Sequence, residues 1–213
     1  MNHNQLHDYL EKLRQPATDW QAELEAEARR DQIPIMERDG IDFLKQMLRL
    51  NQPKRILELG SAIGYSALQM ADAVPNAHIV TIERDHERAK RAIENFNEHN
   101  SSQTIELIVG DAFDVADQVK QKGRYDLIFI DAAKGQYQRF FELFASMLTP
   151  KGVIVTDNVL FHGYVVDSSN ASKRIQKLAQ KIDTYNQWLA NQFDYQTDFY
   201  PIGDGIAISI KKS

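Results

Sequence analysis

Five short apolar runs, each followed by a stretch with helical periodicity, dominate the middle of this chain. The runs lie at residues 55–60, 78–83, 105–110, 125–131 and 152–158. Ile, Val and Leu fill them without polar alternation, which is typical of strands that are buried on both faces. Strands that alternate with helices pair in parallel, because the helix carries the chain back across the sheet. The pattern therefore predicts an α/β fold built on a doubly wound, mostly parallel sheet.

The C-terminal part breaks this alternation. Two further apolar runs, at 195–201 and 205–212, are separated only by residues 202–204, which leaves no room for a helix. Two such strands are expected to form an antiparallel hairpin that completes a sheet of seven strands. Five βα units followed by a terminal hairpin are typical of the Rossmann-like class I methyltransferases that use S-adenosylmethionine (SAM), and not of dinucleotide dehydrogenases.

The first fifty residues are predicted to be helical. Helical periodicity runs through residues 4–15, 20–32 and 37–50. Neither an internal repeat nor a low-complexity linker separates these helices from the strands that follow. We therefore expect a single domain over residues 1–213, in which residues 1–50 form an N-terminal helical cover and residues 51–213 form the Rossmann-like core.

Composition excludes several classes of protein. The chain of 213 residues has no Cys, which excludes a disulfide scaffold, a thiolate zinc site and a cysteine nucleophile. Its formal net charge of −5 argues against strong non-specific binding of nucleic acid, although not against a local basic patch. The N-terminal sequence is polar and no apolar stretch is long enough to cross a bilayer, so we expect a cytoplasmic protein that does not enter a membrane.

Residues suited to a nucleotide follow three consecutive predicted strands. Gly60 and Gly64 lie in the turn after the first strand, Glu83 ends the second, and Asp111 and Ala112 follow the third. Ligands of open α/β sheets bind at these carboxyl ends, where an acidic residue can accept hydrogen bonds from both ribose hydroxyls. A glycine turn alone is also compatible with a simple strand–helix connection, and it does not distinguish NAD from SAM.

Glu58 favours SAM over NAD. A carboxylate at the end of the first strand would repel a pyrophosphate, whereas it suits a ligand that carries an ammonium group and a sulfonium. We therefore expect SAM as the cofactor. A protein that binds SAM without turning it over and a dehydrogenase are the alternatives from other classes.

The fourth and fifth predicted strands end in side chains with oxygen ligands. Asp131 ends the fourth strand, and Asp157 and Asn158 end the fifth. Adjacent parallel strands lie about 4.8 Å apart, so these side chains can share one ion. Two carboxylates and an amide oxygen, with no His or Cys near, favour Mg²⁺ over zinc. Lys134 would point into the same mouth, where it could act as a base on a hydroxyl beside the cation.

Six motifs along the chain carry a family resemblance: ELGSAIGYS, TIERD, GDA, FIDAAKGQY, TDNVL and PIGDGIAIS. Through them the region from about residue 35 to residue 211 resembles the metal-dependent SAM O-methyltransferases that act on catechol and caffeoyl-coenzyme A. The resemblance implies Mg²⁺, SAM and a homodimer. It implies metal ligands Asp131, Asp157 and Asn158, a catalytic pair Lys134 and Asp131, and the cofactor-binding residues Met36, Glu58, Gly60, Gly64, Ser66, Glu83, Asp111, Ala112 and Asp131.

Three longer sequence segments indicate which molecule accepts the methyl group. The strings FIDAAKGQYQ, TDNVLFHG and KIDTYNQWL resemble the bacterial transfer-RNA (tRNA) 5-hydroxyuridine methyltransferases. This implies methylation of 5-hydroxyuridine at the tRNA wobble position, where O4 and the 5-hydroxyl are vicinal and can be chelated as in a catechol. The alternative acceptor is a small catechol or caffeoyl-type phenol. Against it, Ala133 stands where animal catechol enzymes carry Trp before the lysine.

A basic segment is a candidate contact for the anticodon stem-loop of tRNA. Residues 168–181 contain Lys173, Arg174, Lys177 and Lys181 and no acidic residue. Helical spacing puts the three lysines on one face, next to the loop after the predicted metal strand, where they could bind phosphates. A solvated helix face is the alternative.

Overall fold

The computed structural model describes residues 3–212, and the chain divides into two compact units that meet between Ile33 and Pro34. The first unit contains α1 (His3–Leu13) and α2 (Asp19–Arg30), and the second contains α3 (Arg38–Asn51) and everything after it. The helices predicted in the first fifty residues are therefore confirmed, and the boundary between the two units falls after residue 33. That residues 1–50 cover the core of a single domain stays a prediction.

Helix α3 belongs with the sheet because it packs against α4 (Tyr65–Ala73). The ammonium of Lys45 on α3 is buried and lies 2.8 Å from Gln69 Oε1 and 3.0 Å from Asp72 Oδ2, both on α4. Leu44 and Leu48 of α3 are fully buried. Apolar burial together with a partnered buried charge fixes α3 to the core rather than to the helices before it.

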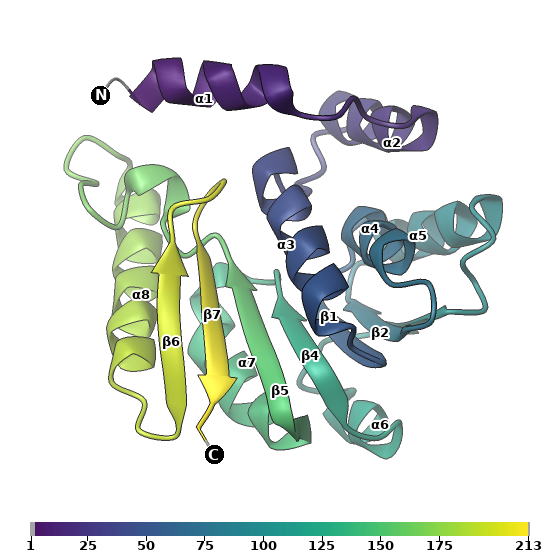
Figure 1. Cartoon of the computed structure of the whole chain (residues 1–213). Coiled ribbons are helices and arrows are strands. Elements are labelled where there is room, and N and C mark those ends of the chain that lie inside the picture. Colours follow the sequence, from purple (N-terminus) through teal and green to yellow (C-terminus); the bar gives the residue numbers. More distant parts are fainter. Residues whose placement is uncertain (1–2, 213) are drawn as a thin grey trace. The chain divides into compact units, whose positions relative to one another are not determined.

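Seven strands form one sheet in the order β3-β2-β1-β4-β5-β7-β6, which confirms the predicted α/β class (Figure 1). The first five pair in parallel, while β7 runs antiparallel to both β5 and β6, as the terminal hairpin predicts. The strands are β1 (Arg55–Leu59), β2 (His78–Glu83), β3 (Ile105–Val109), β4 (Tyr125–Ile130), β5 (Leu148–Asp157), β6 (Tyr195–Tyr200) and β7 (Ile206–Lys211).

Helices cover both faces of this sheet. One face packs against α6 (Ala116–Gln121), α7 (Tyr137–Phe144) and α8 (Lys173–Ala190), and Figure 1 shows α7 and α8 behind the strands. The other face carries α3, α4 and α5 (His86–Glu98). None of the described helices has the length and apolar character that a membrane span requires.

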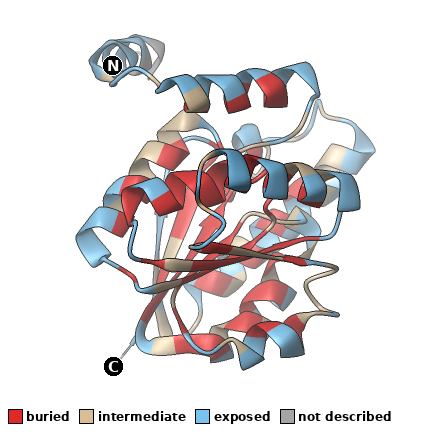
Figure 2. Cartoon of the chain, turned by 90° about the vertical axis from the view of Figure 1, so that its right-hand side faces the viewer, coloured by how far each residue is buried: buried red, intermediate tan, exposed pale blue. Residues whose placement is uncertain are grey.

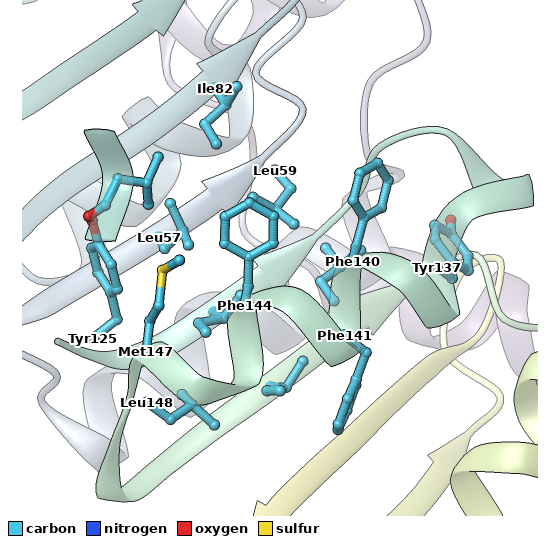
Figure 3. Packing of buried hydrophobic residues seen from close by; sticks show 14 of the residues in the cluster. Leu57, Leu59, Ile82, Tyr125, Tyr137, Phe140, Phe141, Phe144, Met147 and Leu148 are labelled. Carbon is cyan, nitrogen blue, oxygen red and sulfur yellow. The ribbon is translucent and has the colours of Figure 1, made fainter. Parts of the chain in front are cut away.

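The core between the sheet and α7 is aromatic. Phe140 and Phe144 of α7 lie on the side of Leu57 and Leu59 of β1, whereas Phe141 points the other way and packs against Trp188 of α8 and Tyr195 of β6 (Figure 3). The central strands are buried on both faces, as the missing polar alternation predicts, and they are almost wholly red in Figure 2. Each fully buried Leu or Phe contributes about 1.5–3 kcal/mol, so this packing holds the ends of β1 and β4 firmly in place.

Candidate active site

A cavity of about 780 Å³ opens at the carboxyl ends of β1 to β5, where ligands of open α/β sheets bind. It lies within the second unit. Eight residues predicted from the sequence line it together: Gly60, Ser66, Glu83, Asp111, Ala112, Asp131, Lys134 and Asn158. Four others are not among the lining residues: Met36, Glu58, Gly64 and Asp157. Met36 is buried beside Ile35 and Glu37, which do line the cavity.

The glycines after β1 serve contacts within the protein. Gly60 has φ +95°, and a Cβ there would lie 2.3 Å from the carbonyl oxygen of Asp131. Gly64 has φ +85°, and its Cβ would lie 2.4 Å from the ring of Phe96. Only glycine fits the turn against these neighbours. Gly60 also lines the cavity, and that the turn lets a ligand approach closely stays a prediction.

Glu83 is held in place at the end of β2. Its carboxylate accepts the backbone N–H of Ala62 at 2.8 Å and of Asp85 at 2.9 Å. A carboxylate has about four acceptor positions, so two remain for a ligand in the cavity that Glu83 lines. This arrangement suits a pair of ribose hydroxyls.

Glu58 lies beneath the cavity rather than in its wall. The side chain is fully buried and accepts hydrogen bonds from the hydroxyls of Ser66 and Thr81. Burial raises the pKa of its carboxyl from 4.5 to about 7. Glu58 is therefore not a wall residue of the cavity, and its role in holding the cofactor stays a prediction. Side chains alternate along a strand, so Glu58 points away from the layer of Leu57 and Leu59 and reaches the cavity only through Ser66.

At the ends of β4 and β5, the carboxyl groups of Asp131 and Asp157 lie near the ammonium group of Lys134. Lys134 Nζ donates to Asn158 Oδ1, and Asn158 Nδ2 donates to Asp157 Oδ2 at 3.0 Å. Burial raises the pKa of the Asp131 carboxyl and, well above its ordinary value, that of Asp157. The charge of Asp131 raises the pKa of Asp157 further, while Lys134 opposes both increases. A positive charge close to the carboxyl groups of Asp131 and Asp157 is therefore favourable.

The donor set consists of hard oxygen atoms. Among residues 3–212, no three His, Cys, Asp or Glu side chains gather as a metal-ligating group. The set formed by Asp131, Asp157 and Asn158 contains two carboxylates and one amide. Such ligands favour Mg²⁺ over zinc, which prefers nitrogen and sulfur.

Comparison with known proteins identifies the family. The model of the O-methyltransferase family matches residues 4–212. The chain belongs to the O-methyltransferase family. A catechol O-methyltransferase of Niastella koreensis is 33% identical over 195 residues, which cover 88% of this chain and 86% of that relative.

Two solved structures resemble this O-methyltransferase. A Staphylococcus aureus protein, provisionally assigned as a caffeoyl-CoA O-methyltransferase, matches with a TM-score of 0.90 and 38% identity over 96% of this chain and 98% of that one. The methyltransferase PaMTH1 of Podospora anserina, bound to S-adenosylhomocysteine (SAH), matches with a TM-score of 0.86 and 25% identity over 100% and 97%.

Sequence reasoning missed Asp204 of the O-methyltransferase. This buried side chain lines the cavity, and its charge raises the pKa of Asp131 and Asp157. It lies in the turn between β6 and β7. The signal was present in the PIGDG motif, because an antiparallel β7 returns that turn to the carboxyl end of β5.

Arg139 and Phe113 were also missed. The Arg139 guanidinium lies 4.1 Å from the centre of the Phe113 ring, and Phe113 stacks on Phe140. All three residues line the cavity and give it an aromatic wall with a cationic edge.

The predicted basic segment forms the first half of α8 and lies beside the cavity. Lys173, Arg174, Lys177 and Lys181 are exposed, and Leu178 between them lines the cavity. Lys181 also lines a smaller cavity of about 370 Å³ together with Lys134. The structure thus brings the basic segment close to the acidic end of the O-methyltransferase site.

Proposed function

We propose that this O-methyltransferase transfers the methyl group of SAM to a hydroxyl oxygen of an acceptor that presents two adjacent oxygens to Mg²⁺. The observation that carries the proposal is the shape of one cavity, which joins Glu83 at its nucleotide end to Asp131, Asn158 and Lys134 at its acidic end. The SAH-bound relative supports SAM as the methyl donor.

The residues after β1, β2 and β3 would hold SAM. Glu83 would accept hydrogen bonds from the ribose hydroxyls, and Asp111 and Ala112 would flank the adenine. Ser66 and the Gly60 turn would hold the methionine part, and the buried Glu58 carboxyl holds the Ser66 hydroxyl in place. Met36 would contribute only by positioning its neighbours, since it does not line the cavity itself.

Asp131, Asp157 and Asn158 would hold Mg²⁺. Their hard oxygen atoms fit this ion, and the raised carboxyl pKa values of Asp131 and Asp157 support the proposal, because a bound cation would stabilise the ionised carboxylates. When bound, Mg²⁺ supplies a Lewis acid that makes a neighbouring hydroxyl more acidic.

Lys134 would act as the base. Its Nζ contacts Asn158, so it lies within reach of a hydroxyl held at the same residues. In its neutral form Lys134 takes the hydroxyl proton, the oxygen forms a bond to the methyl carbon, and the carbon–sulfur bond breaks. The electron pair goes to sulfur and leaves SAH. The pocket contributes by holding oxygen and methyl carbon in line.

A small catechol or caffeoyl-type phenol is the acceptor that the relatives favour. The similar Niastella koreensis protein is a catechol O-methyltransferase. The aromatic wall of Phe113 and Phe140 would pack against a phenol ring, in place of the Trp that Ala133 replaces.

Methyl transfer from labelled SAM tests this proposal. A catechol panel and tRNA serve as acceptors, each with and without EDTA. Label in catechols that disappears with EDTA supports the proposal, and label that persists with EDTA contradicts the role of Mg²⁺. Asp157→Ala should abolish transfer while calorimetry shows retained SAM binding, and Asp183→Ala, an exposed position on α8, is the control.

The wobble 5-hydroxyuridine of tRNA is the second candidate acceptor. The observation that favours it is the exposed basic segment of α8 beside the cavity, since phosphates bind such surfaces. Replacing Lys173, Arg174 and Lys177 by Glu should lower tRNA methylation by about tenfold or more and leave catechol methylation unchanged. The matched control replaces Lys54, Arg124 and Lys151, exposed residues at the opposite ends of the strands. Equal losses for both acceptors would exclude the segment as an RNA contact.

A further inference from the structure

The loop after β5 has a backbone conformation that needs external support. Asn158, Phe161 and His162 have φ values of +61°, +48° and +52°, and Gly163 follows at +81°. Asn and His adopt this left-handed region more often than most residues, but a bulky Phe does so rarely and at an energetic cost, and two such residues follow each other here. Such conformations persist only where surrounding contacts hold them.

The turn between β6 and β7 supplies those contacts. The N–H of Val159 donates to the carbonyl of Gly205, and the N–H of Leu160 donates to the carbonyl of Asp204, both at 3.0 Å. Gly205 has φ +88°, and a Cβ there would lie 2.3 Å from Leu160 Cγ. The turn and the loop are therefore in contact along their backbones.

The Asp204 side chain adds a third contact, at the most strained part of the loop. Its carboxylate accepts the N–H of His162 and lies 3.4 Å from His162 Nδ1. The side chain is buried, although Asp131 and Asp157 repel its charge. A carboxylate that is buried near two other carboxyl groups requires a hydrogen-bond donor. Among the described contacts, the backbone N–H of His162 is such a donor.

We propose that Asp204 is a positioning residue that fastens the loop of residues 158–163 and thereby aims the Asn158 amide at the acidic end of the cavity. The hydrogen bond of its carboxylate to the His162 N–H holds the two left-handed residues Phe161 and His162. The loop begins at Asn158, so its conformation sets the direction of that side chain. The part of this inference that concerns cation binding rests on the proposed function.

Three variants test the role of Asp204. Asp204→Ala removes the acceptor, and Asp204→Asn keeps an acceptor oxygen but removes the charge. Asp167→Ala is the matched control, because Asp167 accepts the N–H of Ser169 in the next part of the same loop but is exposed. Hydrogen–deuterium exchange reports the loop, and titration with Mn²⁺ alone reports the cation site.

We expect Asp204→Ala to speed exchange of the His162 amide and to weaken Mn²⁺ binding, each by about tenfold, with SAM binding retained. Asp204→Asn should restore both values to within about threefold of the native chain, because an amide oxygen can accept the same N–H. The control should match the native chain in both measurements.

Two results would overturn the proposal. Unchanged exchange in Asp204→Ala would show that the carboxylate does not hold the loop. Equal defects in Asp204→Asn and Asp204→Ala would show that Asp204 acts through its charge. If the native chain binds no Mn²⁺, the proposed metal site fails, while the exchange measurement still decides whether Asp204 fastens the loop.

Discussion

At the scale of single residues, the site depends on carboxylates whose partners differ. Glu83 is exposed to the cavity and receives two backbone N–H groups, whereas Glu58 is sealed beneath it and receives two hydroxyls. A backbone N–H can only donate a hydrogen bond, so it favours the ionised carboxylate. A hydroxyl can donate or accept, so it can bond to the ionised or to the protonated carboxyl group. Glu83 is therefore suited to binding a ligand and Glu58 to responding to pH.

Glu83→Ala should weaken SAM binding by about tenfold or more, because a charged acceptor for the ribose is lost and the N–H groups of Ala62 and Asp85 lose their partner. Isothermal calorimetry with SAM measures the effect. Arg84→Ala, at the neighbouring cavity position, is a useful comparison. An unaltered affinity in Glu83→Ala would remove Glu83 from the ribose role.

Glu58→Gln should reduce the pH dependence of stability. Because the pKa of Glu58 rises from 4.5 to about 7 on folding, the folded chain keeps its proton where the unfolded chain has released it. Folding stability therefore falls as the pH rises from about 4.5 to about 7, by roughly 3 kcal/mol, and is then constant. Urea unfolding between pH 5 and pH 8 should show a shallower decline for Glu58→Gln. The same decline in both proteins would contradict the assignment.

At the scale of elements, the site depends on how α7 meets the end of β5. Tyr137, the first residue of α7, is buried and donates its hydroxyl to the carbonyl of Asp157 at 2.9 Å. Its ring packs against Tyr185 of α8, whose hydroxyl lies 2.8 Å from Thr156 Oγ1. Two tyrosines from two helices thus fix the strand that carries Asp157 and Asn158.

Tyr137→Phe should lower the free energy of unfolding by about 1–3 kcal/mol, because the ring is kept while the buried Asp157 carbonyl loses its donor. Urea unfolding measures the loss. Tyr164→Phe, on a half-exposed ring in the loop after β5, should have little effect. Equal stability of Tyr137→Phe and the native chain would mean that packing alone positions β5.

At the scale of the whole molecule, the sheet could be predicted from the sequence because apolar runs report strands buried on both faces. The ends of the same apolar runs mark the carboxyl ends of the strands. Asp131, Asn158 and Glu83 could therefore be predicted together as residues of one site. The direction of Glu58 could not be predicted, because it depends on the pleat at the end of β1. Asp204 required the order of β5, β7 and β6, which periodicity does not give. The place of α3 required its packing on α4.

The homodimer implied by the family resemblance stays a prediction. An exposed face of β6 and β7 is a candidate surface on which it can be tested. Tyr200, Ile208 and Ile210 share one face of β6 and β7, and Tyr200 and Ile210 are exposed there. The ring of Phe43 of α3 lies 5.6 Å from the Tyr200 ring and extends the apolar part of this surface, which also carries Gln196 and Asp198 opposite Ile210 and Ile208.

If two copies meet on this surface, Ile210→Lys should convert a dimer to a monomer, because it buries a charge in place of an apolar side chain. Sedimentation velocity measures the change. Val166→Lys is the control, since Val166 is an exposed apolar residue of the loop after β5. A native chain that sediments as a monomer, or a variant that remains dimeric, would contradict the proposed surface.

The order of the strands also affects how the protein is made. β7 follows β6 in the chain but lies between β6 and β5 in the sheet. While the ribosome is still adding residues 206–211, β5 has an unpaired edge, and such edges can pair with other chains. Asp204 and the loop it contacts cannot meet before this strand docks. The acidic end of the cavity is therefore complete only after β7 has docked, at the step that also covers the free edge of β5.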